Sequence, residues 1–380
     1  MPRIVADENI PLAREAFGAF GDVELVAGRK IDARTVADAD ALIVRSVTRV
    51  GDALLDGSRV RFVGTATIGT DHVDLAALER RGVAFASAPG CNARSVAEYL
   101  AAVLLELEHE LGRDFRGATI GVVGVGNVGR RVSEVARALG LRVLQCDPPR
   151  AEREPGFASV SLDVLVRAAD VLTFHVPLQK DGPYATRHLL NAERIEQLRP
   201  DAIVVNSSRG GVVDDDALAI ACAAGRAEAV LDVWEDEPHP SSAMLGMVRI
   251  ATPHIAGYSL DGKLAGTRMI ADALARTLGV PGPDAGVFDA PVAEPAIRGS
   301  QSGRAAIREA VRRVYDVRAD DARLRAALAE AGAAAEARGA AFDRLRRDYP
   351  VRREFAGYEV RGIAGDEERR TLAELGFGVL

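Results

Sequence analysis

The run Gly124-Val125-Gly126-Asn127-Val128-Gly129 has the spacing of a phosphate-binding turn. An apolar stretch, Thr119–Val123, precedes it, and apolar residues recur at helical spacing from Val128 to Leu139. In such a turn the first glycine permits a tight bend, the second lets the backbone approach a pyrophosphate, and the third lets helix and strand pack closely. The free N–H groups of the helix start would face the phosphates. The motif therefore predicts a dinucleotide site at Gly124, Gly126, Asn127, Val128 and Gly129.

A carboxylate follows at the place where such a site holds a ribose. Asp147 comes directly after the next predicted strand, Arg142–Cys146, at about the 20-residue spacing that the motif requires. A carboxylate accepts hydrogen bonds from the ribose diol and repels a 2′-phosphate, so Asp147 predicts NAD as the cofactor.

An ionisable side chain follows each of three predicted strands. Arg209 follows Ala202–Asn206, Glu237 follows Ala229–Val233, and His254 follows Val248–Ala251. Carboxyl ends of parallel strands meet at one edge of a sheet, so these side chains should converge there. Histidine can take a hydroxyl proton while hydride leaves the same carbon, and a carboxylate on its other nitrogen fixes the tautomer. A guanidinium can bind a substrate carboxylate bidentately. We therefore assign His254 as the base, Glu237 as its partner and Arg209 as the carboxylate clamp in oxidation of a 2-hydroxy acid.

The elements that must position these residues alternate between strand and helix. In the first third of the chain, strands are expected at Arg3–Ala6, Val23–Val26, Ala41–Val44, Arg61–Thr65 and Val83–Ala86. Helices are expected, among other places, at Pro11–Phe20, Asp74–Arg81 and Ser95–Gly112. The alternation starts again at Ala118, which predicts two doubly wound parallel-sheet units, the second with the cofactor.

The last part of the chain has a different composition. Glycine and proline gather in Gly279–Pro295, which predicts a linker. Helical patterns follow at Gly303–Tyr315 and Ala319–Tyr349, the second interrupted by glycines, and Tyr358–Ile363 has the pattern of a strand. We expect a small α+β domain here.

Bulk composition excludes several classes of protein. The 380 residues are 48% hydrophobic, as in soluble globular proteins, and the net charge of −7 argues against a general nucleic-acid-binding surface. No apolar run reaches the roughly 18 residues of a membrane helix. The three cysteines, Cys91, Cys146 and Cys222, have no metal-ligand spacing. We expect a cytoplasmic protein without a metal, a nucleic-acid partner or a membrane partner.

Several motifs together resemble the D-isomer-specific 2-hydroxyacid dehydrogenases. Besides the glycine turn, they are Asn206-Ser207-Ser208-Arg209-Gly210, Asp232-Val233-Trp234 followed by Glu237-Pro238, and Pro253-His254. The resemblance implies a Rossmann NAD-binding domain over residues 98–257 and a flavodoxin-like substrate-binding domain made of residues 1–97 and 258–285. It agrees with the roles assigned above. The cofactor contacts that it adds are Asp147, His175, Asn206, Ser207, Ser208, Arg209, Asp232 and Gly257.

Other segments resemble one branch of this family, which acts on a small phosphorylated 2-hydroxy acid. These segments include Val44-Arg45-Ser46-Val47-Thr48, residues 64–74 and His254-Ile255-Ala256-Gly257-Tyr258. They imply substrate contacts at Ser46, Thr67 and Tyr258, and Arg45 after its predicted strand suits a phosphate. Residues 314–321 resemble that branch's C-terminal dimerisation domain, which implies a homodimer through residues 286–380. The chain departs from many relatives at Ser207-Ser208, positions that mainly present backbone.

Two alternatives remain open from the sequence. The chain could oxidise another D-2-hydroxy acid, such as 3-phosphoglycerate, although its C-terminal region differs from the regulatory tails of those enzymes. It could also be a non-catalytic scaffold that senses NAD(H). Partner binding that depends on NAD(H) but occurs without turnover would distinguish the scaffold from both enzymes.

Overall fold

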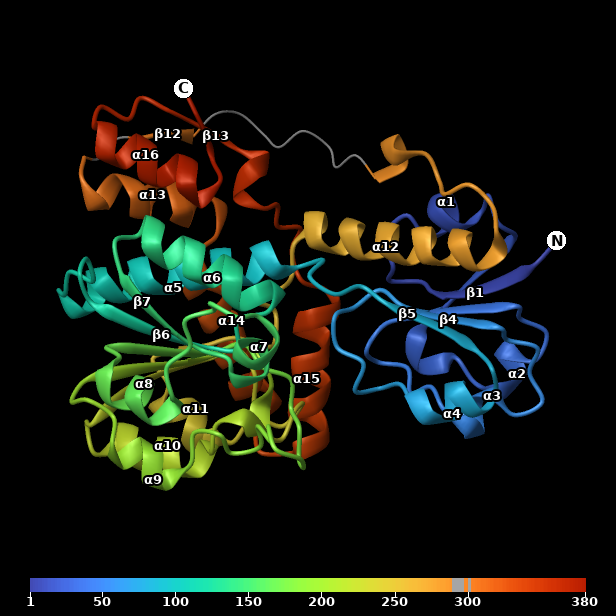
Figure 1. Cartoon of the computed structure of the whole chain (residues 1–380), viewed down its shortest axis with the longest axis horizontal. Coiled ribbons are helices and arrows are strands. Elements are labelled where there is room, and N and C mark those ends of the chain that lie inside the picture. Colours follow the sequence, from blue (N-terminus) through green and yellow to red (C-terminus); the bar gives the residue numbers. More distant parts are fainter. Residues whose placement is uncertain (289–296, 300–301) are drawn as a thin grey trace. The chain divides into compact units, whose positions relative to one another are not determined.

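The structure is a computed structural model that describes residues 1–288, 297–299 and 302–380. The chain divides into two compact units (Figure 1). One comprises Met1–Asn92 and Ser259–Val292, and the other comprises Ala93–Tyr258 and Ala293–Leu380. Each unit is considered by itself.

The first unit is built on a parallel five-stranded sheet of order β2-β1-β3-β4-β5. Its strands are β1 (Arg3–Asp7), β2 (Asp22–Val26), β3 (Ala41–Val44), β4 (Phe62–Thr65) and β5 (Ala84–Ser87). This is the flavodoxin-like order, in which the direction of winding reverses between β1 and β3. The expected fold class is therefore confirmed for this unit.

Five helices among the described residues accompany this sheet: α1 (Ala13–Phe17), α2 (Ala33–Val36), α3 (Asp52–Leu55), α4 (Leu75–Arg80) and α12 (Leu260–Leu278). The helix expected over Pro11–Phe20 is shorter because Leu12 takes a left-handed conformation and the helix ends before Gly18. Helix α12 returns from the second half of the chain and packs on β4 and β5. It ends at Gly279, whose φ of 69° closes it. A short turn of 3₁₀ helix follows at Ala285–Phe288, while residues 289–295 of the expected linker lie outside the described residues.

The second unit contains a parallel six-stranded sheet of order β11-β10-β9-β8-β6-β7. Its strands are β6 (Thr119–Val123), β7 (Arg142–Cys146), β8 (Val171–Phe174), β9 (Ala202–Asn206), β10 (Ala227–Leu231) and β11 (Ile250–Ala251). The winding reverses between β6 and β8, as a Rossmann fold requires. Strand β10 begins and ends two residues earlier than expected, so Asp232 comes directly after it.

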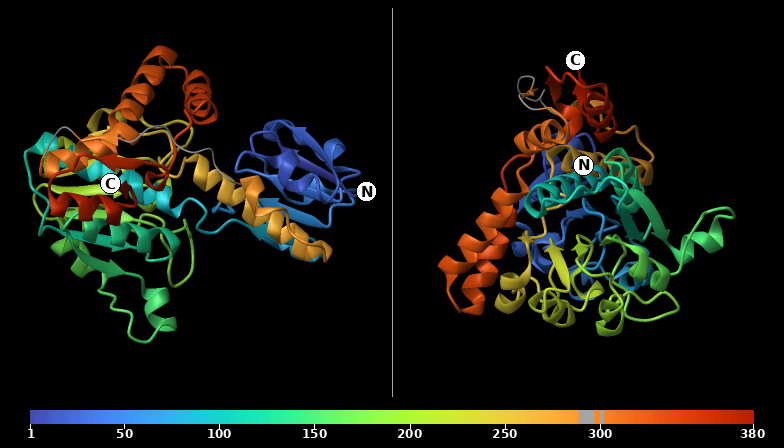
Figure 2. Two further views of the ribbon diagram at one scale, coloured as in Figure 1. Left: turned by 90° about the horizontal axis from the view of Figure 1, so that it is seen from above. Right: turned by 90° about the vertical axis from the view of Figure 1, so that its left-hand side faces the viewer.

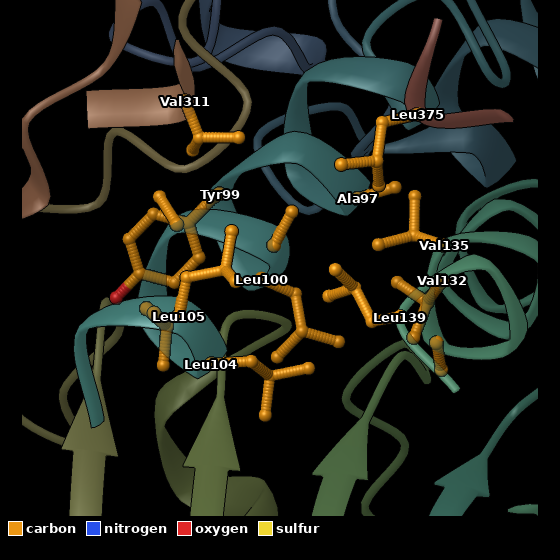
Figure 3. Close-up of a cluster of buried hydrophobic side chains, with 14 of the residues drawn as sticks. Ala97, Tyr99, Leu100, Leu104, Leu105, Val132, Val135, Leu139, Val311 and Leu375 are labelled. Carbon is orange, nitrogen blue, oxygen red and sulfur yellow. The ribbon is translucent and has the colours of Figure 1, made fainter. Parts of the chain in front are cut away.

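Helix α5 (Ala93–Leu111) forms the centre of the core of this unit. All its residues from Ser95 to Glu108 are buried, including three glutamates, so the helix is covered on almost all sides. Figure 3 shows Leu100, Leu104 and Leu105 of α5 among side chains of α6 (Asn127–Ala138) and of the C-terminal residues Val311 and Leu375. The remaining helices before α12 are α7 (Pro148–Arg153), α8 (Leu162–Ala168), α9 (Ala192–Glu196), α10 (Asp215–Ala223) and α11 (Ser242–Met247).

The C-terminal residues belong to the same compact unit as the Rossmann sheet. Their elements are β12 (Ile297–Arg298), α13 (Arg304–Val314), α14 (Val317–Ala331), α15 (Ala335–Arg347), β13 (Glu359–Arg361), α16 (Asp366–Leu375) and β14 (Gly378–Val379). Their three strands pair in parallel, and the break between α14 and α15 falls at Gly332. Helix α13 packs on α5, α16 on α6 and α14 on β11, and Figure 2 shows these C-terminal elements, in orange and red, from two further sides. This region is therefore part of the hydrophobic core around α5.

None of the helices in the described part of the chain combines the length and the apolar character needed to cross a bilayer.

Close packing of α12 on β4 gives a test of the first unit. A Cβ added to Gly64 would lie 2.4 Å from Cγ2 of Ile270, so Gly64→Ala should destabilise the protein by about 1–3 kcal/mol. Gly246 in α11 has no atom within 4 Å of its added Cβ, so Gly246→Ala should be neutral or stabilising by up to about 1 kcal/mol. Urea midpoints of the two variants measure both effects. Equal midpoints would contradict the packing of α12 on β4.

Candidate active site

The glycine turn after β6 has three distinct local requirements. Gly124 has a φ of 81°, in the left-handed region. A Cβ on Gly129 would lie 1.9 Å from the carbonyl oxygen of Gly124, so only glycine lets α6 approach the turn. Gly126 precedes the first residue of α6, and a Cβ there would meet nothing within 4 Å. The space beside Gly126 and the N–H groups of Asn127 and Val128 at the helix start form a cradle that suits a pyrophosphate.

Asp147 lies beside this turn at the end of β7. One of its carboxylate oxygens accepts the N–H of Val125 at 2.7 Å, and the other accepts the N–H of Arg150 at 3.0 Å. Each oxygen keeps a further lone pair. The carboxylate therefore stiffens the glycine turn and can still accept a hydrogen bond from a ribose hydroxyl.

His175 follows β8 on the other side of the glycine turn. Its Nε2 lies 3.0 Å from Oγ1 of Thr173, while its buried Nδ1 has no hydrogen-bond partner among the described residues. Burial lowers the pKa of His175 to about 3, so the ring is neutral at physiological pH. A buried nitrogen without a partner next to the cradle fits a cofactor-lining position better than a base.

The proposed acid–base pair is assembled in the structure. Nδ1 of His254 lies 2.7 Å from a carboxylate oxygen of Glu237, and the other oxygen of Glu237 accepts the N–H of Trp234 at 3.0 Å. Burial alone would raise the pKa of Glu237, but the charge and hydrogen bond of His254, with the charge of Arg346, hold it below its usual value. Whenever His254 carries a single ring proton, an ionised Glu237 holds that proton on Nδ1, which leaves Nε2 as the proton acceptor.

The loop that carries His254 is folded around Asp232. The carboxylate of Asp232 accepts the N–H groups of Ile255 and Ala256 at 2.8 and 2.9 Å and the hydroxyl of Thr252 at 2.6 Å. His254 has a φ of 57°, and its N–H bonds the carbonyl of Asp232 at 2.7 Å. Burial raises the pKa of Asp232, although the charge of His254 and these hydrogen bonds act to lower it. Asp232 thus fixes the direction in which the His254 ring leaves the backbone.

Arg209 stands in a tight turn after β9. The side-chain oxygen of Asn206 accepts the N–H of Ser208 at 3.1 Å, and its amide donates to the carbonyl of Arg209 at 2.8 Å. A Cβ on Gly210 would lie 1.9 Å from the carbonyl oxygen of Trp234. The Arg209 turn and the loop between Trp234 and Glu237 are therefore in direct contact at the same end of the sheet.

The remaining expected substrate contacts are divided between the units. Arg45 and Ser46 follow β3, and Thr67 follows the neighbouring strand β4. Oγ1 of Thr67 lies 2.7 Å from Oγ1 of Thr65, so its position is fixed by a neighbouring hydroxyl. Tyr258 belongs to the second unit, three residues after Ile255, whose carbonyl its N–H bonds at 2.8 Å.

One neighbour of the pair was not expected from the sequence. The guanidinium of Arg346 in α15 lies 6.0 Å from the ring centroid of Tyr258, and its charge acts on Glu237. Its buried Nε has no hydrogen-bond partner among the described residues. No local motif marks Arg346, because it is one arginine among many in a surface-like helical pattern about 100 residues away in sequence.

The residues present fit NAD. The cradle beside Gly126, the carboxylate of Asp147 and the partnerless nitrogen of His175 lie in succession after β6, β7 and β8. Among the described residues, no group of three or more His, Cys, Asp or Glu side chains is placed to hold a metal ion.

Comparisons with known proteins identify the family of the chain. Residues 92–256 match the family profile described as "D-isomer specific 2-hydroxyacid dehydrogenase, NAD binding domain", and residues 289–376 match a "Domain of unknown function (DUF3410)". An erythronate-4-phosphate dehydrogenase of Azotobacter vinelandii is 51% identical over 97% of this chain and 96% of its own. One of Klebsiella pneumoniae is 46% identical over 100% of this chain and 98% of its own.

Solved structures share the fold over about three quarters of the chain. A D-lactate dehydrogenase of Aquifex aeolicus, in complex with NAD and lactic acid, superposes with a TM-score of 0.59 at 26% identity, covering 73% of this chain and 96% of that one. A 3-phosphoglycerate dehydrogenase of Entamoeba histolytica with bound NAD⁺ gives 0.63 at 22% identity, covering 73% and 95%, which shows similarity of fold alone.

Substitutions of Gly126 and Gly129 should separate cofactor binding from stability. Gly126→Ala places a methyl group in the open cradle and should weaken NADH binding by at least about tenfold, or about 1.4 kcal/mol. Gly129→Ala forces α6 away from the turn and should lower the unfolding midpoint much more than Gly126→Ala does. Fluorescence titration with NADH and urea unfolding measure the two effects. Unchanged NADH affinity in Gly126→Ala would contradict the cradle.

The lowered pKa of His175 should appear in the pH dependence of stability. Because the unfolded chain protonates this histidine near pH 6.5 and the folded chain only near pH 3, acidification across this window favours unfolding. His175→Gln should therefore reduce the loss of unfolding free energy between pH 6.5 and the lowest pH at which the protein stays folded. Urea unfolding at several pH values measures this slope, with the exposed His109→Gln as control. Identical slopes in wild type and His175→Gln would show that His175 is not held neutral.

Proposed function

Because the chain belongs to the erythronate-4-phosphate dehydrogenase family, with the NAD-binding domain of the D-isomer-specific 2-hydroxyacid dehydrogenases, we propose that it oxidises 4-phospho-D-erythronate. The product is 2-oxo-3-hydroxy-4-phosphobutanoate, and the reaction serves bacterial pyridoxal 5′-phosphate biosynthesis. The observation that carries the chemistry is the 2.7 Å contact of His254 with Glu237 in the unit that holds the glycine cradle.

Three side chains divide the work of the reaction. Nε2 of His254 takes the proton of the C2 hydroxyl, and Glu237 stabilises the imidazolium that results. Arg209 binds the substrate carboxylate through two parallel hydrogen bonds and so orients C2. NAD, held by the glycine cradle and Asp147, supplies the hydride acceptor when bound. His175, the Asn206–Arg209 turn, Asp232 and Gly257 line its site.

The rest of the substrate belongs to the first unit in this proposal. Arg45 and Ser46 follow β3, next to the point where the winding of the flavodoxin-like sheet reverses, and ligands of such sheets bind beyond the carboxyl ends there. Guanidinium and hydroxyl donors at this position suit a phosphate group. Thr67 and Tyr258 complete the substrate contacts. The first compact unit thus acts as the substrate-binding domain, and the part of the second unit up to Tyr258 acts as the cofactor domain.

The same proposal includes the oligomeric state of the protein and its location in the cell. Residues 286–380 mediate a homodimer, which the mass of the protein in solution tests. The enzyme works in the cytoplasm, where NAD and phosphorylated intermediates are present.

The substrate is tested by incubating the protein with NAD and a panel of D-2-hydroxy acids that includes 4-phospho-D-erythronate and 3-phosphoglycerate. NADH absorbance reports turnover, and a parallel set with an added 2-oxo acid detects turnover hidden by retained NADH. The highest kcat/KM should be for 4-phospho-D-erythronate. Preference for another acid would keep the reaction type and refute the substrate. Binding of NAD without any turnover would favour the sensing scaffold.

The role of His254 is tested by His254→Asn, which removes the base but keeps a polar side chain of similar shape. We expect kcat to fall by about 10²–10⁴-fold, since general base catalysis is worth that much, with NADH affinity within about threefold of wild type. The exposed His109→Asn in the same unit is the matched control. Parallel losses of kcat and NADH affinity would argue that His254 is structural.

A further inference from the structure

The C-terminal helices are hydrogen-bonded to the main chain that leads to His254. Asp321 in α14 accepts the N–H of Ala251 in the edge strand β11 at 2.8 Å. Arg318 donates to the carbonyl of Arg249 at 2.6 Å, and Arg325 donates to two carbonyls, those of Leu245 and Val248, at 2.7 and 2.8 Å. Strand β11 has only two residues, so these contacts supply pairing that its free edge lacks.

Arg352 also binds the main chain of the loop from His254 to Tyr258, which carries the proposed base. Its Nε donates to the carbonyl of Tyr258 at 2.8 Å and its Nη2 to the carbonyl of Ala256 at 2.9 Å. The residue is only 6% exposed, and its guanidinium lies 4.1 Å from the ring centroid of Tyr315. The planar fork of one side chain thus holds the two carbonyls on either side of Gly257.

The segment that carries Arg352 is itself fixed to the core helix. Glu98 of α5 accepts the N–H of Phe355 at 2.9 Å, and Ser95 of α5 donates to Glu354 at 2.8 Å. Phe355 is fully buried and stacks on Phe377. Arg352 is therefore presented from a rigid base.

The loop from His254 to Tyr258 is consequently held from two sides. Its N–H groups at Ile255 and Ala256 bind the carboxylate of Asp232, and its carbonyls at Ala256 and Tyr258 bind Arg352. The first set comes from the Rossmann sheet and the second from the C-terminal region. Water could replace Arg352 only if it entered a buried site.

We propose that the C-terminal region, besides any part in dimerisation, supports the active site of its own chain, with Arg352 as the positioning residue of the His254–Tyr258 loop. Arg352 acts through the main chain, so it fixes where His254 and Tyr258 stand without touching the substrate. This inference rests on the proposed function only in the tests that measure turnover. The test by hydrogen exchange does not depend on the substrate.

A matched pair of variants separates positioning from general support. Arg352→Met and Arg325→Met each remove a C-terminal arginine that binds two carbonyls of residues 245–258, but only Arg352 reaches the loop. Because a displacement of about 1 Å can cost about 100-fold in rate, we expect kcat of Arg352→Met to fall by about 10–100-fold. We expect kcat of Arg325→Met to stay within about threefold of wild type, although this variant also loses hydrogen bonds to the main chain.

Two further measurements keep the test decisive. Amide hydrogen exchange at residues 255–258 should be at least about tenfold faster in Arg352→Met than in wild type or Arg325→Met, whatever the substrate is. If Arg352→Met does not fold, Arg352→Ala refolded with guanidinium ion should regain kcat as the ion concentration rises, and Arg325→Ala should not respond.

Each outcome decides the inference. Wild-type exchange and wild-type kcat in Arg352→Met would overturn it, as would equal losses of kcat in the two methionine variants. Absence of guanidinium rescue in the folded Arg352→Ala would also overturn it. Fast exchange in Arg352→Met, together with a wild type that does not oxidise 4-phospho-D-erythronate, would uphold the loop support and refute the proposed substrate.

Discussion

Asp232 is almost fully buried directly after β10, and the chain that follows β11 wraps around its carboxylate. A buried carboxylate without partners would cost several kcal/mol, so the loop must bring hydrogen-bond donors to both oxygens. Ile255, Ala256 and Thr252 supply them. Their convergence requires the sharp bend at His254, where φ is 57°. The placement of the proposed base thus follows from satisfying the hydrogen bonds of one buried carboxyl group.

The same end of the sheet gathers the other groups because all six strands are parallel. The glycine turn, Asp147, His175, the Arg209 turn and the Glu237 loop each follow a strand, so short connections bring them to one edge. Contacts of the main chain, rather than of long side chains, set most of these positions. Gly129 and Gly210 both lie where an added Cβ would collide with a carbonyl at 1.9 Å.

The C-terminal region also holds main chain close to the proposed base. Its helices complete the core around α5, and its side chains bind the main chain from Leu245 to Tyr258. It also places Arg346 beside Glu237 and Tyr258. Solved dehydrogenases of the same fold cover about three quarters of this chain. A region that the sequence predicts as a separate small domain after a linker is therefore integrated with the part that carries the chemistry.

The sequence by itself determined the two large parallel sheets, the glycine turn and the pairing of His254 with Glu237. Strands β6, β7 and β9 have the predicted bounds, because short apolar runs between polar turns specify buried parallel strands locally. The residue roles rest on motifs whose members lie just beyond those strands, so local pattern and topology suffice to bring them near one another.

Tertiary structure alone decided what surrounds these groups. Arg346 and Arg352 come from a helical region with no chemical motif, and their positions depend on how that region packs on α5 and β11. Burial and partners distant in sequence likewise determine three further features: the hydrogen bonds that Asp232 accepts, the low pKa of His175 and the early end of β10. Local residue patterns encode which faces are apolar, but not which distant polar groups will meet when those faces are buried.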